Sequence, residues 1–195
     1  IIHRILNKKE DKKRVKEKFC FFSKNRGPGK LVWFHGSSVG EIMSVIPIIK
    51  RYDNDKSINK ILITSSTLSS SNILEKIKFK KVTHQFYPID YFFFSNVFLN
   101  YWKPNIAIFL ESEIWPSMFK AIKKRNIPLI LLNARITNKT FNRWLKLYSF
   151  SKSIFNLIDI AYPQNNETKN FLQKFDLKKI KIIGNLKYID NNDFK

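Results

Sequence analysis

Short apolar runs rich in β-branched and aromatic residues alternate along this chain with longer amphipathic runs. Seven runs have the length and composition of strands: residues 31–35, 60–64, 82–87, 105–110, 128–133, 158–163 and 180–183. Six runs have the pattern of helices: residues 41–51, 70–79, 92–102, 116–125, 139–157 and 167–175. Strands that alternate with helices in this way form a parallel sheet covered on both faces. We therefore predict an α/β fold, a Rossmann-like parallel sheet with helices on both faces.

The first part of the chain differs from the rest. Residues 1–24 predict a basic helical lead-in, and "NRGPGK" at 25–30 breaks the chain before the first strand. We assign residues 25–195 to one domain. The chain begins at Ile1 rather than at a methionine, so we expect an upstream piece. The most apolar run, residues 91–102, is shorter than the roughly 18 residues that a spanning helix needs.

Charge and cysteine content narrow the classes of partner. Thirty-six Lys and Arg residues against 15 Asp and Glu give a net charge of +21, which suits a polyanion or an anionic membrane. Compositional drift is an equal alternative, because Lys, Asn, Ile and Phe are abundant throughout. The basic, aromatic run 139–157 likewise predicts either a core-facing helix or one that lies on a membrane. With Cys20 alone and no metal-ligand spacing of His, Cys or acids, we expect no disulfide and no metal.

Ligands of parallel sheets bind at the carboxyl ends of the strands, which here carry "HGSSVGE", "TSSTLSSS", "YPID", "ESEIWP", "NARIT" and "PQNNET". The first loop matches no standard nucleotide fingerprint. Ser38 and Glu41 have the spacing of a capping box, with Glu41 reaching back to the Ser38 backbone N–H. Alternatively, Glu41 is held ionised at the helix start and takes a proton from a substrate, while Gly36 and Gly40 allow a close approach.

Two further loops carry charged residues. Glu111 and Glu113 follow an apolar strand, and their i, i+2 spacing makes them neighbours if the strand continues. The alternative is one solvated acid and one that caps the helix after it. We expect the side chains of Arg135 and Lys187 to contact either an anionic group or solvent. His35 and His84 lack catalytic or metal spacing, so we interpret both as structural.

Together these loops resemble one family, the Kdo transferases, where Kdo is 3-deoxy-D-manno-octulosonic acid. The matching stretches are "KKRVKEKF", "HGSSVGE", "YPID", "FLESEIWP", "IPLILLNARIT", "PQNNET" and "GNLK", which occur in the family's order over nearly the whole chain. The resemblance implies an inverting glycosyltransferase of GT-B architecture, of which this chain would be the N-terminal, acceptor-binding half. It ends near the interdomain linker, and the C-terminal CMP-binding domain would be absent, so the chain alone would be an incomplete enzyme.

The resemblance also implies a reaction and roles. The family transfers Kdo from CMP-Kdo to a lipid A precursor in lipopolysaccharide synthesis, at the cytoplasmic face of the inner membrane. Glu41 matches the general base, and Glu111 and Lys187 match transition-state stabilisers. We expect substrate contacts from a further set of residues: Ser37, Ser38, Gly40, Glu113 and Arg135.

The expected partners follow from this reaction. They are CMP-Kdo, a lipid A precursor and an anionic membrane surface, to which the protein would be peripheral or anchored. We expect no cofactor, no metal and no nucleic acid. Two other functions stay open: a basic nucleic-acid-binding module, and a GT-B transferase with another acceptor.

Overall fold

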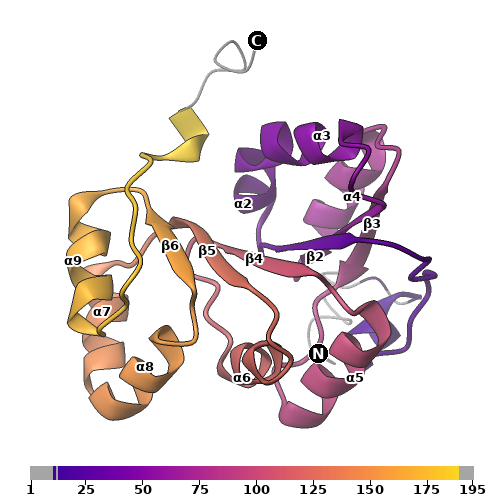
Figure 1. The fold of residues 1–195 in the computed structure, drawn as a ribbon. Helices are drawn as coiled ribbons and strands as arrows, with labels where there is room; N and C mark the ends of the chain where they lie inside the picture. The colour runs from indigo at the N-terminus through magenta and orange to yellow at the C-terminus, as the bar shows by residue number, and fades with distance from the viewer. Residues whose placement is uncertain (1–10, 12, 189–195) are drawn as a thin grey trace.

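A six-stranded, fully parallel sheet forms the centre of the molecule. The computed structural model describes residues 11 and 13–188. The strands are β1 (Leu31–His35), β2 (Lys60–Ser65), β3 (Val82–Phe86), β4 (Ile106–Leu110), β5 (Leu129–Ala134) and β6 (Ile160–Pro163). Their order in the sheet is β3-β2-β1-β4-β5-β6, and every pair is parallel (Figure 1). The predicted Rossmann-like α/β fold is confirmed.

Helices connect the strands. They are α2 (Val39–Ser44), α3 (Ile46–Asn54), α4 (Leu68–Lys76), α5 (Phe92–Trp102), α6 (Pro116–Lys124), α7 (Asn138–Leu145), α8 (Tyr148–Phe155) and α9 (Asn166–Lys174), with 3-10 turns η1 (Val15–Phe19) and η2 (Leu186–Tyr188). Four helices begin with a side chain that accepts a backbone N–H three residues later: Ser38, Thr67, Thr137 and Asn165. These caps satisfy donors that the first turn of a helix leaves unpaired, which fixes where each helix begins.

Two predicted helices are broken. The run 41–51 is divided at Val45 into α2 and α3, because Pro47 has no N–H with which to continue the helical ladder. The run 139–157 is divided at Leu147, where the backbone leaves helical angles. The Ser151 hydroxyl lies within hydrogen-bond distance of the Trp144 and Leu147 carbonyl oxygens and can donate its proton to either, which adds a side-chain bond at this second break.

Two further predictions at the ends of the chain are corrected. Residues 180–183 do not form a strand: Ile180 makes one bridge to Ala161, and the chain then leaves the sheet. Among the described lead-in residues, 11 and 13–24, the 3-10 turn η1 is the helical part, and residues 20–24 are irregular. The remaining lead-in prediction, for residues 1–10 and 12, lies outside the described residues.

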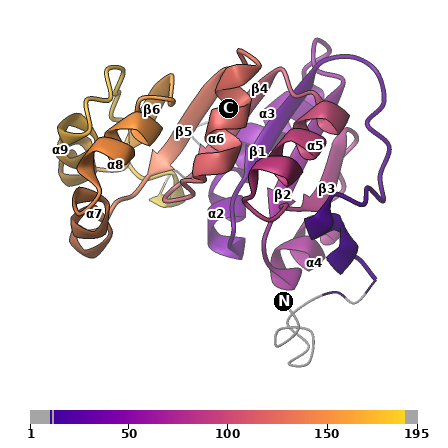
Figure 2. The ribbon, with the colours of Figure 1, turned by 90° about the horizontal axis from the view of Figure 1, so that it is seen from below.

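The sheet separates two apolar layers. Alternate β1 side chains enter opposite layers: Trp33 enters the layer that contains α5, α6 and α8, and Phe34 enters the layer that contains α2 and α3, and both are fully buried. Figure 1 shows α6 and α8 below the sheet and α2 and α3 above it, and Figure 2 shows α5, α6 and α8 next to one another from below. Strands β1–β3 are therefore covered on both faces.

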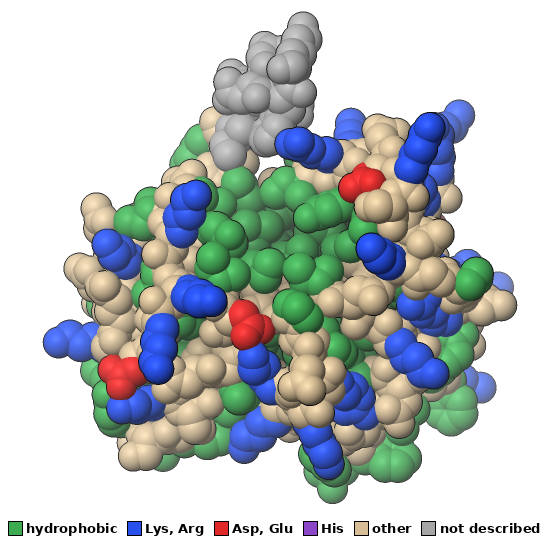
Figure 3. Space-filling view, viewed as in Figure 1, with side chains coloured by type: hydrophobic (Ala, Val, Ile, Leu, Met, Phe, Trp, Pro, Cys, Tyr) green, Lys and Arg blue, Asp and Glu red, His purple; other side chains and the backbone are tan. Residues whose placement is uncertain are grey.

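Strands β4–β6 are covered less completely. On the face that carries α2 and α3, Ile106, Ile130 and Tyr162 are only partly buried. Figure 3 shows an apolar hollow on this side of the molecule, bordered by basic side chains. On the same face Ile108, Leu110 and Leu132 are buried together with residues of α2, α3 and η2, so among the described residues this half of the sheet is covered on this face only in part.

The run 139–157 combines features of both predicted alternatives. Phe141 and Trp144 pack against the core beneath them. Leu145 and Tyr148 are 37% and 43% exposed. The helical stripe is therefore only partly a core-facing one.

The lead-in is attached to β3 by a buried polar cluster. Glu17 is 1% exposed; its carboxylate pairs with Arg14 and accepts the Phe86 backbone N–H. Arg14 also donates to the carbonyl of His84 and to its ring Nδ1. A guanidinium has no acceptor, so Nδ1 of His84 is unprotonated and Nε2 donates to Ser65. Burial, and then the Arg14 charge, lower the pKa of His84 to about 3.

This histidine predicts acid sensitivity. Its pKa is about 3 in the fold and about 6.5 unfolded, so only the unfolded state gains a proton between these values. Stability should fall as the pH drops below about 6.5. Replacing His84→Asn should reduce the loss between about pH 7.5 and about pH 5.5 by about 1 kcal/mol, measured by urea unfolding. An equal loss in the variant would mean that His84 is protonated in the fold.

Candidate functional site

Glu41 lies on the first turn of α2, directly after β1. The Ser38 hydroxyl accepts the Glu41 N–H at 3.3 Å and donates to Glu41 Oε1 at 2.9 Å. Glu41 Oε2 accepts a backbone N–H at 2.8 Å, but from Ser37 rather than from Ser38. The predicted cap is confirmed, and its return bond is shifted by one residue. Both carboxylate oxygens are thus held by the loop before the helix.

The two glycines of this loop differ in their surroundings. A Cβ on Gly36 would lie 2.9 Å from a Leu110 methyl and 3.2 Å from Glu41 Cβ, so a side chain there would require these neighbours to shift. A Cβ on Gly40 would meet only Lys187 Nζ, at 4.0 Å. Gly36 is therefore closely surrounded by side chains, whereas Gly40 faces open space.

Glu113 accepts hydrogen bonds from three side chains. Its Oε2 accepts the Ser37 hydroxyl at 2.6 Å, Trp115 Nε1 at 2.8 Å and His35 Nε2 at 3.1 Å. Burial acts to raise the pKa of Glu113, but the hydrogen bonds from His35, Ser37 and Trp115 outweigh it and hold this pKa below its usual value. Ser37 therefore joins two acids, through its N–H to Glu41 and its hydroxyl to Glu113.

His35 supports Glu113 from within the core. The ring is fully buried and stacks on Tyr87 with a centroid separation of 3.8 Å. Burial lowers the pKa of His35 despite the neighbouring Glu113, so the ring is neutral near pH 7. With Nε2 donating to Glu113, Nδ1 accepts from the Thr64 hydroxyl at 2.9 Å. The structural interpretation of His35 is borne out by these contacts.

Glu111 and Lys187 form a second charged pair. The carboxylate of Glu111 is buried, and Lys187 Nζ lies 2.6 Å from its Oε1. Strand β4 ends at Leu110, and Glu111 has a left-handed backbone with φ of 49°. The i, i+2 alignment with Glu113 therefore ends, and the two acids take different partners. That correction follows from the turn, which a strand pattern cannot predict.

Asn133 connects this pair to the sheet. It has a φ of 54° at an irregularity between β5 and β6, and it is fully buried. Its Oδ1 accepts the Leu186 N–H at 3.1 Å, which fixes η2, the turn that carries Lys187. Sequence analysis selected Arg135 from "NARIT" and missed Asn133. The signal available was the tolerance of Asn for left-handed backbone.

The charges of the site act together on Glu41. Burial first, and then the negative charge of Glu113, raise the pKa of Glu41, while bonds from Ser38 and Ser37 lower it; Glu111 adds a smaller increase. The net direction is upward. A carboxylate with a raised pKa is a stronger base, which is the property that proton abstraction needs.

The other residues considered in the sequence take little part in this site. Arg135 is exposed, and only its backbone N–H touches the site, at the Glu111 carbonyl. Residues 11 and 13–188 contain no cluster of three or more His, Cys, Asp or Glu side chains that could hold a metal. Burial raises the pKa of Cys20 to about 11, so its thiol stays protonated.

Comparison with known proteins identifies the family. The family model described as "3-Deoxy-D-manno-octulosonic-acid transferase (kdotransferase)" matches residues 13–189. A 3-deoxy-D-manno-octulosonic acid transferase of Rickettsia bellii is 35% identical over 96% of this chain, and one of Haemophilus influenzae is 26% identical over 93%. A probable mitochondrial one of Arabidopsis thaliana is 41% identical over 74%. The chain spans 45%, 44% and 34% of these relatives, respectively.

Solved structures agree on the fold. UDP-N-acetylglucosamine 2-epimerase from Rickettsia bellii aligns with 82% of this chain and 46% of its own, with a TM-score of 0.56 and 14% identity. The Neisseria meningitidis enzyme bound to UDP-GlcNAc aligns with 81% of this chain and 47% of its own, with a TM-score of 0.56 and 15% identity. At such identities the likeness concerns the fold alone. From the family match across nearly the whole described chain, we conclude that this protein belongs to the Kdo transferase family.

Proposed function

We propose that residues 25–195 form the acceptor-binding domain of an inverting GT-B glycosyltransferase that moves Kdo from CMP-Kdo to a lipid A precursor. The observation that carries this proposal is the setting of Glu41. Its carboxylate is held by Ser37 and Ser38 at a helix start, and burial together with the charge of Glu113 raises its pKa. Family membership supports Kdo transfer as the reaction, and this setting supports Glu41 as its base.

The chemistry assigns each charged group a role. The acceptor hydroxyl attacks C2 of Kdo while its proton passes to Glu41, and the bond between C2 and the phosphate oxygen breaks as CMP leaves with the electron pair. Positive charge develops on the sugar and negative charge on the departing phosphate. The Glu111 carboxylate stabilises the first and the Lys187 ammonium the second. Their ion pair of 2.6 Å keeps both charges at one place before the substrates bind.

One substitution separates the base from the cap. In Glu41→Gln the amide oxygen can still accept the Ser37 N–H and the amide NH2 can donate to the Ser38 hydroxyl oxygen, but the side chain cannot take a proton. In the full-length protein we expect turnover to fall by roughly 10²–10⁴-fold, with a melting temperature close to wild type. Steady-state kinetics and thermal unfolding measure the two effects. Near-normal turnover by the folded variant would leave Glu41 as a cap only.

The pH profile provides the control. Turnover should rise as the pH passes upward through the raised pKa of Glu41, because only the carboxylate is a base. Removing the negative charge in Glu113→Gln lowers that pKa, so the acidic limb should move to lower pH. An unmoved limb would exclude Glu113 as a source of the raised pKa.

Asn133 has a positioning role in this scheme. Its only described side-chain hydrogen bond is to the Leu186 N–H, one residue before Lys187. Its left-handed backbone suits Asn and Gly much better than Ala. Two substitutions therefore separate the backbone requirement from the hydrogen bond.

In Asn133→Gly the backbone is tolerated and the acceptor is lost; in Asn133→Ala both are affected. We expect faster hydrogen exchange of the Leu186 amide in both variants, and about tenfold lower kcat with little change in KM. Only the Ala variant should show a marked fall in melting temperature. If Asn133→Gly keeps the wild-type rate of Leu186 amide exchange and the wild-type kcat, the Asn133 side chain has no positioning role and only its backbone conformation matters.

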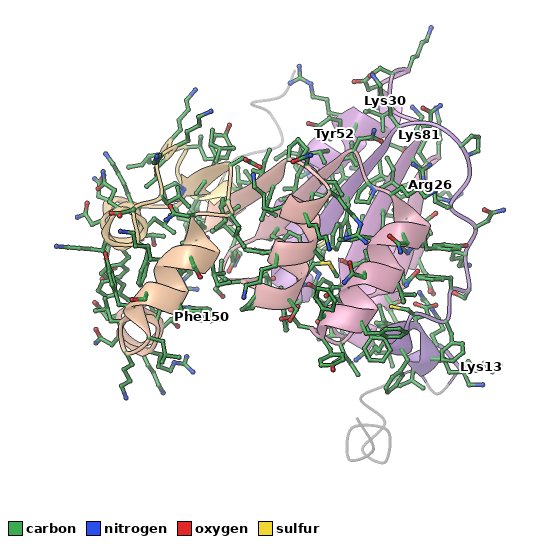
Figure 4. The ribbon with its side chains drawn as sticks, turned by 60° about the horizontal axis from the view of Figure 1, so that its bottom comes forward. Lys13, Arg26, Lys30, Tyr52, Lys81 and Phe150 are labelled. Atoms are coloured by element: carbon green, nitrogen blue, oxygen red, sulfur yellow. The ribbon has the colours of Figure 1, made fainter. Side chains whose placement is uncertain are left out.

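An exposed aromatic surface supports the expected membrane contact. Phe21, Tyr91, Phe92 and Phe93 are each 59–66% exposed. Their two segments adjoin, because the Ile89 N–H donates to the Lys18 carbonyl. Basic side chains, among them Lys13, extend from the same end of the molecule (Figure 4). No helix within residues 11 and 13–188 is long and apolar enough to cross a bilayer.

We propose that this aromatic surface places the protein on the cytoplasmic face of the inner membrane. Phe92→Ser together with Phe93→Ser should weaken binding to vesicles of phosphatidylglycerol and phosphatidylcholine by about tenfold. The matched control, Leu147→Ser with Phe150→Ser, removes exposed apolar side chains at the other end of the molecule (Figure 4). Co-sedimentation measures both. Equal loss in the two double variants would mean that no particular surface binds the membrane.

A further inference from the structure

Thr64 lies directly across from His35 in the sheet. The parallel pairing of β1 with β2 aligns these two residues, and Trp33 lies two residues before His35 on the same face of β1. All three side chains are fully buried. The Thr64 hydroxyl oxygen lies 2.9 Å from Trp33 Nε1 and 2.9 Å from His35 Nδ1. One buried hydroxyl therefore contacts both the indole and the imidazole.

The two ends of this chain of hydrogen bonds fix its direction. An indole N–H can only donate, and a carboxylate can only accept. Trp33 therefore donates to Thr64, and Glu113 accepts from His35. The Thr64 hydroxyl keeps one proton to donate, and the Phe34 carbonyl oxygen, its other acceptor among the described residues, is farther away at 3.4 Å. The Thr64 proton is thus directed to Nδ1 of His35.

A second group of the same residue competes at Nδ1. The backbone carbonyl oxygen of Thr64 lies 3.2 Å from His35 Nδ1 and would accept a hydrogen bond if that nitrogen carried a proton. The ring would then be either an imidazolium or the Nδ1–H tautomer. That tautomer would place a bare Nε2 at 3.1 Å from the Glu113 carboxylate, and two acceptors repel each other. The hydroxyl and the carbonyl of Thr64 therefore favour different forms of the ring.

The remaining neighbours of the imidazole carry no charge. Tyr87 stacks on the ring, and Phe109 and Trp115 lie edge to face with it. Burial, and then the negative charges of Asp90 and Glu113, raise the pKa of Tyr87 well above its usual value, so the phenol stays neutral. Among the described residues that contact the ring, Glu113 is thus the charged one.

We propose that Thr64 is a positioning residue, whose hydroxyl holds His35 as the neutral Nε2–H tautomer that donates to Glu113. The inference rests on the proposed function, because the form of the ring affects turnover only if Glu41 is the base. A neutral His35 leaves the negative charge of Glu113 uncompensated. This charge is one of the causes of the raised pKa of Glu41. Thr64 thereby acts on the base from the neighbouring strand β2, through His35 and Glu113.

The first measurement observes the ring directly and needs no turnover. In a two-bond 1H–15N correlation spectrum of the 195-residue chain, His35 should show the Nε2–H tautomer from about pH 5.5 to about pH 8. The spectrum of His35→Gln assigns its signals. Thr64→Val removes the hydroxyl and leaves the backbone carbonyl, so we expect a proton on Nδ1 and an imidazolium at the acidic end of this range. Thr64→Ser retains the hydroxyl and should keep the wild-type tautomer.

The second measurement follows the acidic limb of the turnover profile of the full-length protein. An imidazolium next to Glu113 offsets its negative charge, which lowers the pKa of Glu41. In Thr64→Val the limb should therefore move to lower pH, by roughly half a unit, whereas Thr64→Ser should leave it in place. The amide of His35→Gln can donate to Glu113 and does not titrate. Adding Thr64→Val to His35→Gln should cause no further shift, because Thr64 acts through the imidazole.

Ser65→Ala is the matched control, because it removes another fully buried hydroxyl of β2 that is bonded to His84 instead of His35. It should leave the His35 signals and the acidic limb unchanged, even where it lowers the melting temperature as much as Thr64→Val does. An equal movement of the limb in both variants would assign the effect to lost stability and overturn the proposal.

The spectra and the turnover profile separate this inference from the proposed function. A proton on Nδ1 of wild-type His35 near pH 7, or unchanged His35 signals in folded Thr64→Val, would overturn the positioning role. The wild-type spectrum decides the tautomer even if Thr64→Val does not fold. Altered signals with an unmoved limb would overturn the effect on Glu41. Conversely, a full-length protein without Kdo transfer activity would contradict the proposed function and leave the His35 spectra unchanged.

Discussion

The pairing of β1 with β4 is the constraint on which the candidate site depends. These strands are neighbours in the sheet, with His35 opposite Phe109, although β2 and β3 lie between them in sequence. The chain leaves β1 toward α2 and leaves β4 toward α6, on opposite faces. The two loops therefore diverge and leave room between the strand ends. The hydrogen bond from Ser37 to Glu113 spans that space and joins the loops.

Burying acids at this point requires a partner for each of them. Glu113 is satisfied by three neutral donors and Glu111 by an ammonium group, whereas Glu41 has only serine N–H and hydroxyl groups. The acid with the weakest compensation is thus the one at the helix start. His35 allows this arrangement because it stays neutral: a fixed positive charge there would lower the pKa of the neighbouring acids.

Local sequence patterns predicted the sheet well, because β-branched and aromatic runs need only their own composition to be recognised. The predicted strand 31–35 agrees with β1, and the predicted helix 92–102 agrees with α5. The Ser38 cap was also readable, since a cap is a local motif. The break before Pro47 was visible in principle, but the apolar periodicity continues through it. Local patterns therefore predict helices and strands better than they predict the breaks within them.

The rest of the site depends on contacts between distant segments. Lys187 pairs with Glu111 from η2, whose Leu186 N–H is bonded to Asn133, and the spacing of these residues in the sequence predicts neither contact. The left-handed backbone at Glu111 is set by the bonds of its N–H to Leu132 and of its carbonyl to Arg135. The different roles of Gly36 and Gly40 likewise appear only when the neighbouring atoms are known. Sequence could nominate these residues, but it could not arrange them.

The incomplete cover of one face of β4–β6 has a thermodynamic consequence. Ile106, Ile130 and Tyr162 keep part of their apolar surface in water in the folded state. Unfolding this half of the sheet therefore exposes less new apolar area than unfolding a sheet covered on both faces, and its heat-capacity increment is correspondingly smaller. A smaller increment flattens the dependence of stability on temperature. Any segment or partner that covers these strands would restore the missing increment as a negative heat-capacity change of binding.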